Sequence, residues 1–342
     1  MIKWNHDFAV QMQQLLKQQQ DQLLQARIAA YGDFRRHLRK ALIFSLIWFT
    51  LVIGFRWMAD QGMQPLALLL GWIHVGFYYF LFGFVPFILL VAYLAAPLSD
   101  FHEASRDVLL RPLATRLGEQ FRYLAADESF TMDAWKDSEL LPAYHEFKAG
   151  DHVTVADTAD TPLHICHVKL DLRDARVGSN TSGSQRRTVF AGLLIDTRLG
   201  IRVPAEIVLR SRETPTVKSK RRTKVAVGHA AFDQRFVVES DHPATVEALF
   251  DERFCETWMT LSDRWMAAGA TREPEAHLHR HHAQLAVRLD QLWYRPARLF
   301  MGRLNEAELK RFATQTTFSL QLLEAIEQAG RRNLPDADGQ TE

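Results

Sequence analysis

Two long apolar stretches stand out in the pattern of hydrophobic and polar positions, and both fall within the first hundred residues. The first runs from Ala41 to Met58 and is apolar until Arg56. The second runs from Leu66 to Ala96 without a Lys, Arg, Asp or Glu. A helix that crosses the hydrocarbon core of a membrane needs roughly 20 apolar residues. The pattern therefore predicts transmembrane helices at 41–58 and 66–97, joined by an external turn at 59–65.

Charge refines this picture. The chain carries 41 Lys and Arg against 40 Asp and Glu, a formal net charge of +1, which excludes a globally basic nucleic-acid binder. Basic residues precede the first apolar stretch and follow the second, while the turn between them has only Asp60. By the positive-inside rule both termini are cytoplasmic, and for a bacterial protein this topology means the inner membrane. A cleaved signal peptide is the alternative for the first stretch, but its apolar run would begin much nearer the N-terminus.

The segments that flank the apolar stretches have helical periodicity. Residues 1–40 are rich in Gln and predict a cytoplasmic amphipathic helix that leads into the first span. This helix packs on the protein's own cytoplasmic domain or, alternatively, forms a short coiled coil or lies on the membrane surface. After the second span, leucines at three- and four-residue steps predict a helix from Ser99 to about Ala126, within a helical stalk and linker at 98–150.

From about residue 151 the period changes to two, which is typical of strands. In the segment 164–173, Cys166 and Val168 face one way while His167 and Lys169 face the other, so we expect a half-buried strand. Residues 188–196 are apolar on both faces and suit a central strand. The pattern predicts an α+β cytoplasmic domain over 151–302, with a mostly antiparallel sheet flanked by helices.

Helical signals return towards the C-terminus. Asp241, followed by His242-Pro243, predicts a helix start in which Asp241 is the N-cap. Apolar residues then form one stripe: Val246, Leu249, Phe250, Phe254, Leu261 and Trp265. A last helix is expected at 303–330, because Asn305 and Glu308 resemble a capping box, and 331–342 is expected to be a disordered tail.

A histidine tract is the first candidate for chemistry. If this stretch is a strand, alternation puts His277, His279 and His281 on one face, at a spacing that could hold a divalent metal. Glu275 is the only nearby acid that could complete such a site. The competing interpretation, which we favour, is an exposed polar face.

The second candidate is a basic run between two strand-like segments, which we interpret as a hairpin loop. Five positive charges occur in seven residues without an acid: Lys218, Lys220, Arg221, Arg222 and Lys224. On a domain tethered to the membrane, such a loop could bind anionic lipid headgroups. The alternative is a solvated loop, and nucleic acid is disfavoured because no aromatic residues interleave the run.

Linear signatures of catalysis are missing from the sequence. It contains no GxSxG, HExxH, Walker or GxGxxG motif, so we assign no catalytic residue and no cofactor. Asp241 with His242 could act as an acid–base pair, but a helix cap explains Asp241 without further assumptions.

The order of these pieces resembles the bacterial domain-of-unknown-function family number 3137. The features that match are a basic helix, two close spans, a helical stalk, a strand pair around Asp151–Val153 and 189–194, and the segment Phe236–Asp241 followed by a helix. The resemblance implies the topology and fold class, and carries no catalytic residue. It implies one candidate partner, a small coiled-coil membrane protein of the LemA type.

The leading hypothesis is therefore a non-enzymatic, membrane-anchored interaction or scaffold protein that recognises an unknown protein partner and can also form a homo-oligomer. The alternatives are a domain that senses membrane lipids or a small ligand through the basic 218–224 loop, and an enzyme whose active site leaves no linear motif.

Overall fold

The computed structural model describes residues 8–61, 85–117, 121–124, 130–135, 138–155, 163–174, 185–214, 222–291, 294, 297–298, 301–304 and 306–334. By their contacts they form two compact units. One unit holds the described residues of 10–108 and 297–304. The other holds residues 8–9 and the described residues of 109–296 and 305–342.

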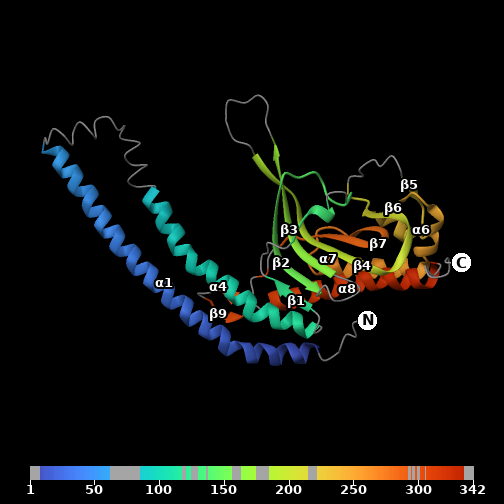
Figure 1. Cartoon of the computed structure of the whole chain (residues 1–342), viewed down its shortest axis with the longest axis horizontal. Coiled ribbons are helices and arrows are strands. Elements are labelled where there is room, and N and C mark those ends of the chain that lie inside the picture. The colour runs from blue at the N-terminus through green and yellow to red at the C-terminus, as the bar shows by residue number, and fades with distance from the viewer. Residues whose placement is uncertain are drawn as a thin grey trace. The chain divides into compact units, whose positions relative to one another are not determined.

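The first unit is built on two long helices (Figure 1). Helix α1, Phe8–Asp60, joins the predicted 1–40 helix and the 41–58 span without a break. Helix α4, Val85–Leu117, begins inside the predicted second span, whose earlier residues lie outside the described part. The two helices meet where the ring of His37 lies 4.4 Å from that of Tyr93, centroid to centroid. A short pair of strands, β8 (Ala297–Arg298) and β9 (Met301–Leu304), completes the unit.

Among the described residues, one helix is long and apolar enough to cross a membrane, Pro86–Arg116, and only 11% of its apolar window is buried. The predicted turn at 59–65 is described as far as Gln61, and its first two residues still belong to α1.

The second unit is an α+β domain around a seven-stranded antiparallel sheet. The strand order is β1-β2-β3-β4-β6-β5, and β7 pairs with β4 as well. Their bounds are β1 Phe121–Leu124, β2 Glu146–Val155, β3 Leu163–Asp174, β4 Gln185–Ser211, β5 Thr223–Val225, β6 Phe236–Ser240 and β7 Glu275–Arg288. The predicted fold class of this domain is thus confirmed, and the histidine tract lies on a strand as expected.

Helices pack against the sheet. They are the short 3-10 helix η2 (Asp133–Trp135) and the α-helices α5 (Ala230–Arg235), α6 (Pro243–Leu249), α7 (Glu252–Ala267) and α8 (Glu306–Asn333). The predicted apolar stripe from Val246 to Trp265 is buried throughout, but it belongs to two helices, because Asp251 caps a new helix start.

The two faces of the sheet carry different layers. On one face, Cys166, Val168 and Leu194 pack with Trp135 and Leu140 from the irregular segment before β2; we refer to this as the Trp135 face. On the opposite face, α8 packs against the sheet, and the ring of Tyr123 in β1 lies 6.1 Å from that of Phe312. Since both faces are covered, β3 is buried on both sides at its centre, rather than half-buried as predicted.

Two further expectations differ from the structure. The helix expected to continue to Ala126 ends at Leu117, and Phe121 and Tyr123 are buried in strand β1 with the intervening Arg122 exposed, a period of two. The segments 151–153 and 189–194 are strands, but each pairs with β3, which lies between them.

Candidate functional site

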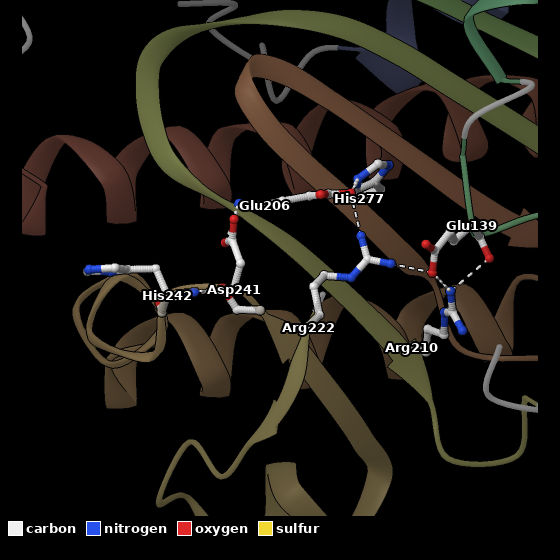
Figure 2. Close-up of polar contacts among 8 residues, drawn as sticks. Glu139, Glu206, Arg210, Arg222, Asp241, His242 and His277 are labelled. Atoms are coloured by element: carbon white, nitrogen blue, oxygen red, sulfur yellow. Dashed lines mark hydrogen bonds and ion pairs between the residues drawn. The ribbon is translucent and has the colours of Figure 1, made fainter. Parts of the chain in front are cut away.

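Five charged or titratable side chains meet on the Trp135 face, and we call them the arginine network: Glu139, Glu206, Arg210, Arg222 and His277 (Figure 2). Arg222 forms ion pairs with Glu206 through Nη1 and with Glu139 through Nη2. Arg210 Nη2 donates to the Glu139 backbone carbonyl oxygen over 2.8 Å and lies 3.4 Å from Glu139 Oε2. His277 Nε2 lies 3.0 Å from Glu206 Oε1.

The register of the sheet explains why these residues meet. Side chains two apart on a strand share a face, so Glu206, Val208 and Arg210 of β4 point the same way. Val208 belongs to the Trp135 core, which fixes that direction. His277 of β7 lies directly opposite Val208 and therefore between Glu206 and Arg210. Arg222, just before β5, and Glu139, in the irregular segment before β2, complete the group.

The arginines of the network are buried and the acids are partly exposed. The side chains of Arg210 and Arg222 are both 2% exposed, whereas those of Glu139 and Glu206 are 30% and 32% exposed. A buried charge is tolerated only when it is paired and hydrogen-bonded. Even so, Arg210 Nε and Nη1 and Arg222 Nε have no hydrogen-bond partner in the described structure. The network therefore holds buried N–H donors that its own acids do not use.

Two titratable groups of β7 lie in this environment. Burial lowers the pKa of His277, and the nearby Arg222 and His279 act in the same direction, while the hydrogen bond and charge of Glu206 oppose the shift. At neutral pH His277 is therefore mainly uncharged, and its Nε2–H donates to Glu206. Burial raises the pKa of Glu275, against the opposing effects of Thr214, Arg288 and Arg210.

Asp241 does not cap a helix, contrary to the prediction. The N-cap of α6 is His242, whose side chain makes no capping hydrogen bond. The Asp241 Oδ1 instead accepts a hydrogen bond of 3.0 Å from the backbone N–H of Glu206 (Figure 2). His242 Nδ1 lies 2.9 Å from the Thr245 hydroxyl. Through this hydrogen bond to Glu206, Asp241 connects the end of β6 to the arginine network.

The basic run is divided by the structure. Arg222 points inward and is buried, while Lys224 in β5 is exposed. Lys218, Lys220 and Arg221 lie outside the described residues. The run does not form a hairpin as predicted, because β5 pairs with β6, and β6 lies between β5 and β4.

The histidines of β7 lie in different surroundings. His277 joins the arginine network, His279 is exposed, and His281 Nδ1 lies 3.0 Å from the carbonyl oxygen of Ile201. Arg280 has a positive φ of 53°, and the pairing with β4 shifts register beside it, so strict alternation is interrupted there. Across the part of the chain that is described, no three His, Cys, Asp or Glu side chains gather closely enough to hold a metal ion.

A second buried polar cluster was missed by sequence reasoning. It lies on the α8 face around Asp151, which accepts hydrogen bonds from the Tyr123 hydroxyl over 2.5 Å and the Tyr294 backbone N–H over 2.8 Å. His167 Nδ1 is 3.8 Å from Asp151 Oδ2, and the Tyr294 hydroxyl donates to Gln315 of α8. Burial, followed by the charge of Asp151, raises the pKa of Tyr294 well above its usual value. No spacing in the sequence connects these residues.

Comparison with protein-family models and with curated proteins finds no match to this chain. Among solved structures, it is similar to the crystal structure of the mycobacterial trehalose monomycolate transport factor A, TtfA, at 12% sequence identity and a TM-score of 0.39. The similarity covers 67% of this chain and 96% of that one. A likeness of this degree supports no conclusion about function.

Proposed function

We propose that this chain is a non-enzymatic interaction protein of the bacterial inner membrane, anchored by two spans, whose α+β domain recognises a partner in the cytoplasm. The observation that carries the proposal is the distribution of exposed apolar side chains. Of the 19 large hydrophobic residues that are exposed in the described structure, 17 lie on α1 and α4. A water-soluble surface rarely presents such a concentration of apolar area, and lipid is the solvent that satisfies it.

The charges beside this apolar surface support the orientation. Arg35, Arg36, Arg39 and Lys40 are exposed on α1 immediately before the apolar residues begin at Ala41. Tyr93, near the end of the apolar part of α4, contacts α1 at His37, so the two apolar segments end at the same level. Basic residues at one such level favour the cytoplasmic side, and aromatic residues favour the interface.

Labelling of single cysteines in intact cells tests this topology. The native Cys166 and Cys255 are buried, so added thiols at exposed positions report alone. We expect Gln61→Cys to react with a membrane-impermeant maleimide from outside, and Lys310→Cys to react only after lysis. Extraction of the protein by alkaline carbonate, or labelling of both positions from outside, would contradict the proposal.

The partner is proposed from the order of elements, which is the basis of the proposed resemblance to family number 3137. We propose a coiled-coil membrane protein of the LemA type, or a second copy of this chain through α1. Cross-linking in native membranes followed by mass spectrometry tests both, with a chain lacking residues 98–342 as the control. A partner retained in that control would show that the domain is not the recognising part.

A second candidate function is lipid sensing by the basic loop, favoured by the exposure of Lys224. Hydrogen exchange of residues 212–228 would be compared in nanodiscs of anionic and zwitterionic lipid. The lipid hypothesis expects slower exchange in anionic discs, and loss of that difference in Lys220→Glu/Arg221→Glu/Lys224→Glu. Arg222 is kept in this variant because it is buried.

A further inference from the structure

The two acids of the arginine network, Glu206 and Glu139, differ in how firmly the structure holds them. Glu206 pairs with Arg222 and His277 and has its backbone N–H bound to Asp241, so it is held from three sides (Figure 2). Glu139 comes from an irregular segment, and one of its oxygens, Oε2, contacts the guanidinium groups of both arginines. Glu139 is therefore the more easily displaced of the two acids.

The two arginines have more N–H donors than Glu139 accepts from. A guanidinium has five N–H donors in a planar fork that matches the two oxygens of a carboxylate. Arg210 uses only Nη2, while its Nε and Nη1 are buried without an acceptor, and Arg222 Nε is in the same position. A buried donor without an acceptor costs free energy. A carboxylate that bridges Nη2 and either Nε or Nη1 of Arg210 supplies an acceptor that Glu139 does not, so it satisfies this arrangement better than Glu139 does.

We propose that Arg210 and Arg222 form a binding site for the carboxylate of a ligand, and that Glu139 occupies this site in the free protein. The inference rests on the proposed recognition function and names the chemistry that it recognises. The side chain of Glu139 is 30% exposed, so it can leave to water when a ligand carboxylate enters. Glu206 remains in place and keeps Arg222 paired.

Charge selects a carboxylate over a phosphate. Replacing the Glu139 carboxylate by another carboxylate leaves the charge around the two arginines unchanged. A phosphate dianion would add negative charge beside Glu206 and near Glu275, which already interacts electrostatically with Arg210. Like charges at such a site raise its free energy, so the site favours a planar group with a single negative charge between the arginines. One carboxylate of a larger ligand meets this condition while its other charged groups remain in water.

Calorimetry on the full chain in nanodiscs tests the proposal, with glutarate as the probe and neutral glutaramide as its control. Glutarate is expected to bind and glutaramide is not. Glu139→Gln removes the competing carboxylate, so glutarate should bind it about tenfold more tightly than wild type. Glu256→Gln, an exposed acid on α7, is the matched control and should leave binding unchanged. Arg210→Met should abolish binding.

Several results would overturn the proposal. These are absence of glutarate binding to both wild type and Glu139→Gln, equal binding by Arg210→Met, or tighter binding of inorganic phosphate than of glutarate. Should Arg210→Met fail to fold, the comparison of Glu139→Gln with wild type decides alone.

A second titration distinguishes a protein side chain from a free acid as the source of the carboxylate. It compares binding of a peptide of alternating Glu and Gly with binding of the same peptide in which Gln replaces Glu. Cysteine labelling reports the membrane topology separately, so either proposal can fail without the other.

Discussion

Arg210 and Glu139 lie 71 residues apart in the sequence, yet Arg210 Nη2 donates to the backbone carbonyl oxygen of Glu139 over 2.8 Å. This contact joins the long central strand to the irregular segment that covers it. Because that segment also places Trp135 and Leu140 in the core, the polar contact and the apolar packing hold the same layer in place. The carboxylate site that we propose is thus attached directly to the hydrophobic core.

Substitution of Arg222, which is buried, should lower the free energy of unfolding more than substitution of Lys224, which is exposed. Arg222→Met leaves Glu139 and Glu206 without their shared guanidinium, and loss of one partner of a buried pair costs about 3–5 kcal/mol. Since both acids are about a third exposed and can rehydrate, we expect a loss of about 2 kcal/mol in the free energy of unfolding. Lys224→Met should change it by less than about 0.5 kcal/mol. Chemical denaturation measures both, and equal effects would contradict the burial of Arg222.

The cap of α7 should make stability depend on pH. Asp251 Oδ1 accepts from the Phe254 N–H over 2.7 Å, and its carboxylate also binds Arg332 and Asn333 of α8. Burial opposes ionisation of Asp251, but the hydrogen bonds from Asn333, Phe254 and Arg332 outweigh it, so its pKa lies below the usual value. A depressed pKa gives stability that is complete above the unfolded value, about 3.9, and is lost as pH falls through the folded value.

Asp251→Ala should therefore lower the free energy of unfolding by about 1–2 kcal/mol at pH 7, the usual worth of a cap. The difference from wild type should shrink below about pH 4, because Asp251 is then protonated in wild type. Denaturant titrations between pH 3 and 7 measure this, with Glu256→Ala, an exposed residue within α7, as the control. A difference that stays constant over this range would count against the ionised cap.

A close approach of two strands should make one glycine irreplaceable. A Cβ on Gly192 of β4 would overlap the backbone carbonyl oxygen of Val287 in β7, and backbone cannot move aside as a side chain can. Gly192→Ala should cost about 3 kcal/mol or more. Gly200→Ala, in the same strand, meets only the ends of Arg331 and Glu327 at 3.4 and 3.6 Å and should cost less than about 1 kcal/mol. Thermal unfolding of the two variants tests the contrast, and equal midpoints would refute it.

The two thiols should report global unfolding. Burial raises the pKa of Cys255 to about 12, with the charges of Asp233 and Asp251 acting in the same direction. At pH 8 the reactive thiolate is then only about 10⁻⁴ of the population. We expect no labelling of Cys255 or of the buried Cys166 in native buffer, and stoichiometric labelling of both in denaturant. Rapid modification of one thiol in native buffer would be inconsistent with this packing.

Local periodicity was sufficient to predict the strands around Cys166 and His277 and the buried stripe from Val246 to Trp265. In these segments apolar residues recur in the sequence at the period of the element itself, so neighbours in sequence carry the signal. The same reasoning failed at Phe121, where four residues are too few to distinguish a short strand from the end of the preceding helix.

The residues of the candidate site could not be predicted together, because they lie far apart in the sequence. Arg222 looks like Lys224 in sequence, and its pairing with Glu139 and Glu206 distinguishes it in the structure. Asp241 fits a local capping pattern, but the backbone N–H that it binds belongs to Glu206, 35 residues away. Long-range pairing decided both, and a local pattern contains no information about it.

The length of β4 has a consequence for synthesis of the protein. This 27-residue strand pairs with β3 before it in the chain and with β6 and β7 after it, and β7 ends only at Arg288. During translation, β4 therefore lacks its later partners, β6 and β7, until most of the chain has been synthesised. Sheets that depend on such distant pairings fold slowly and expose unpaired edges meanwhile. The nascent domain therefore exposes an unpaired edge of β4 during synthesis that the folded domain does not expose.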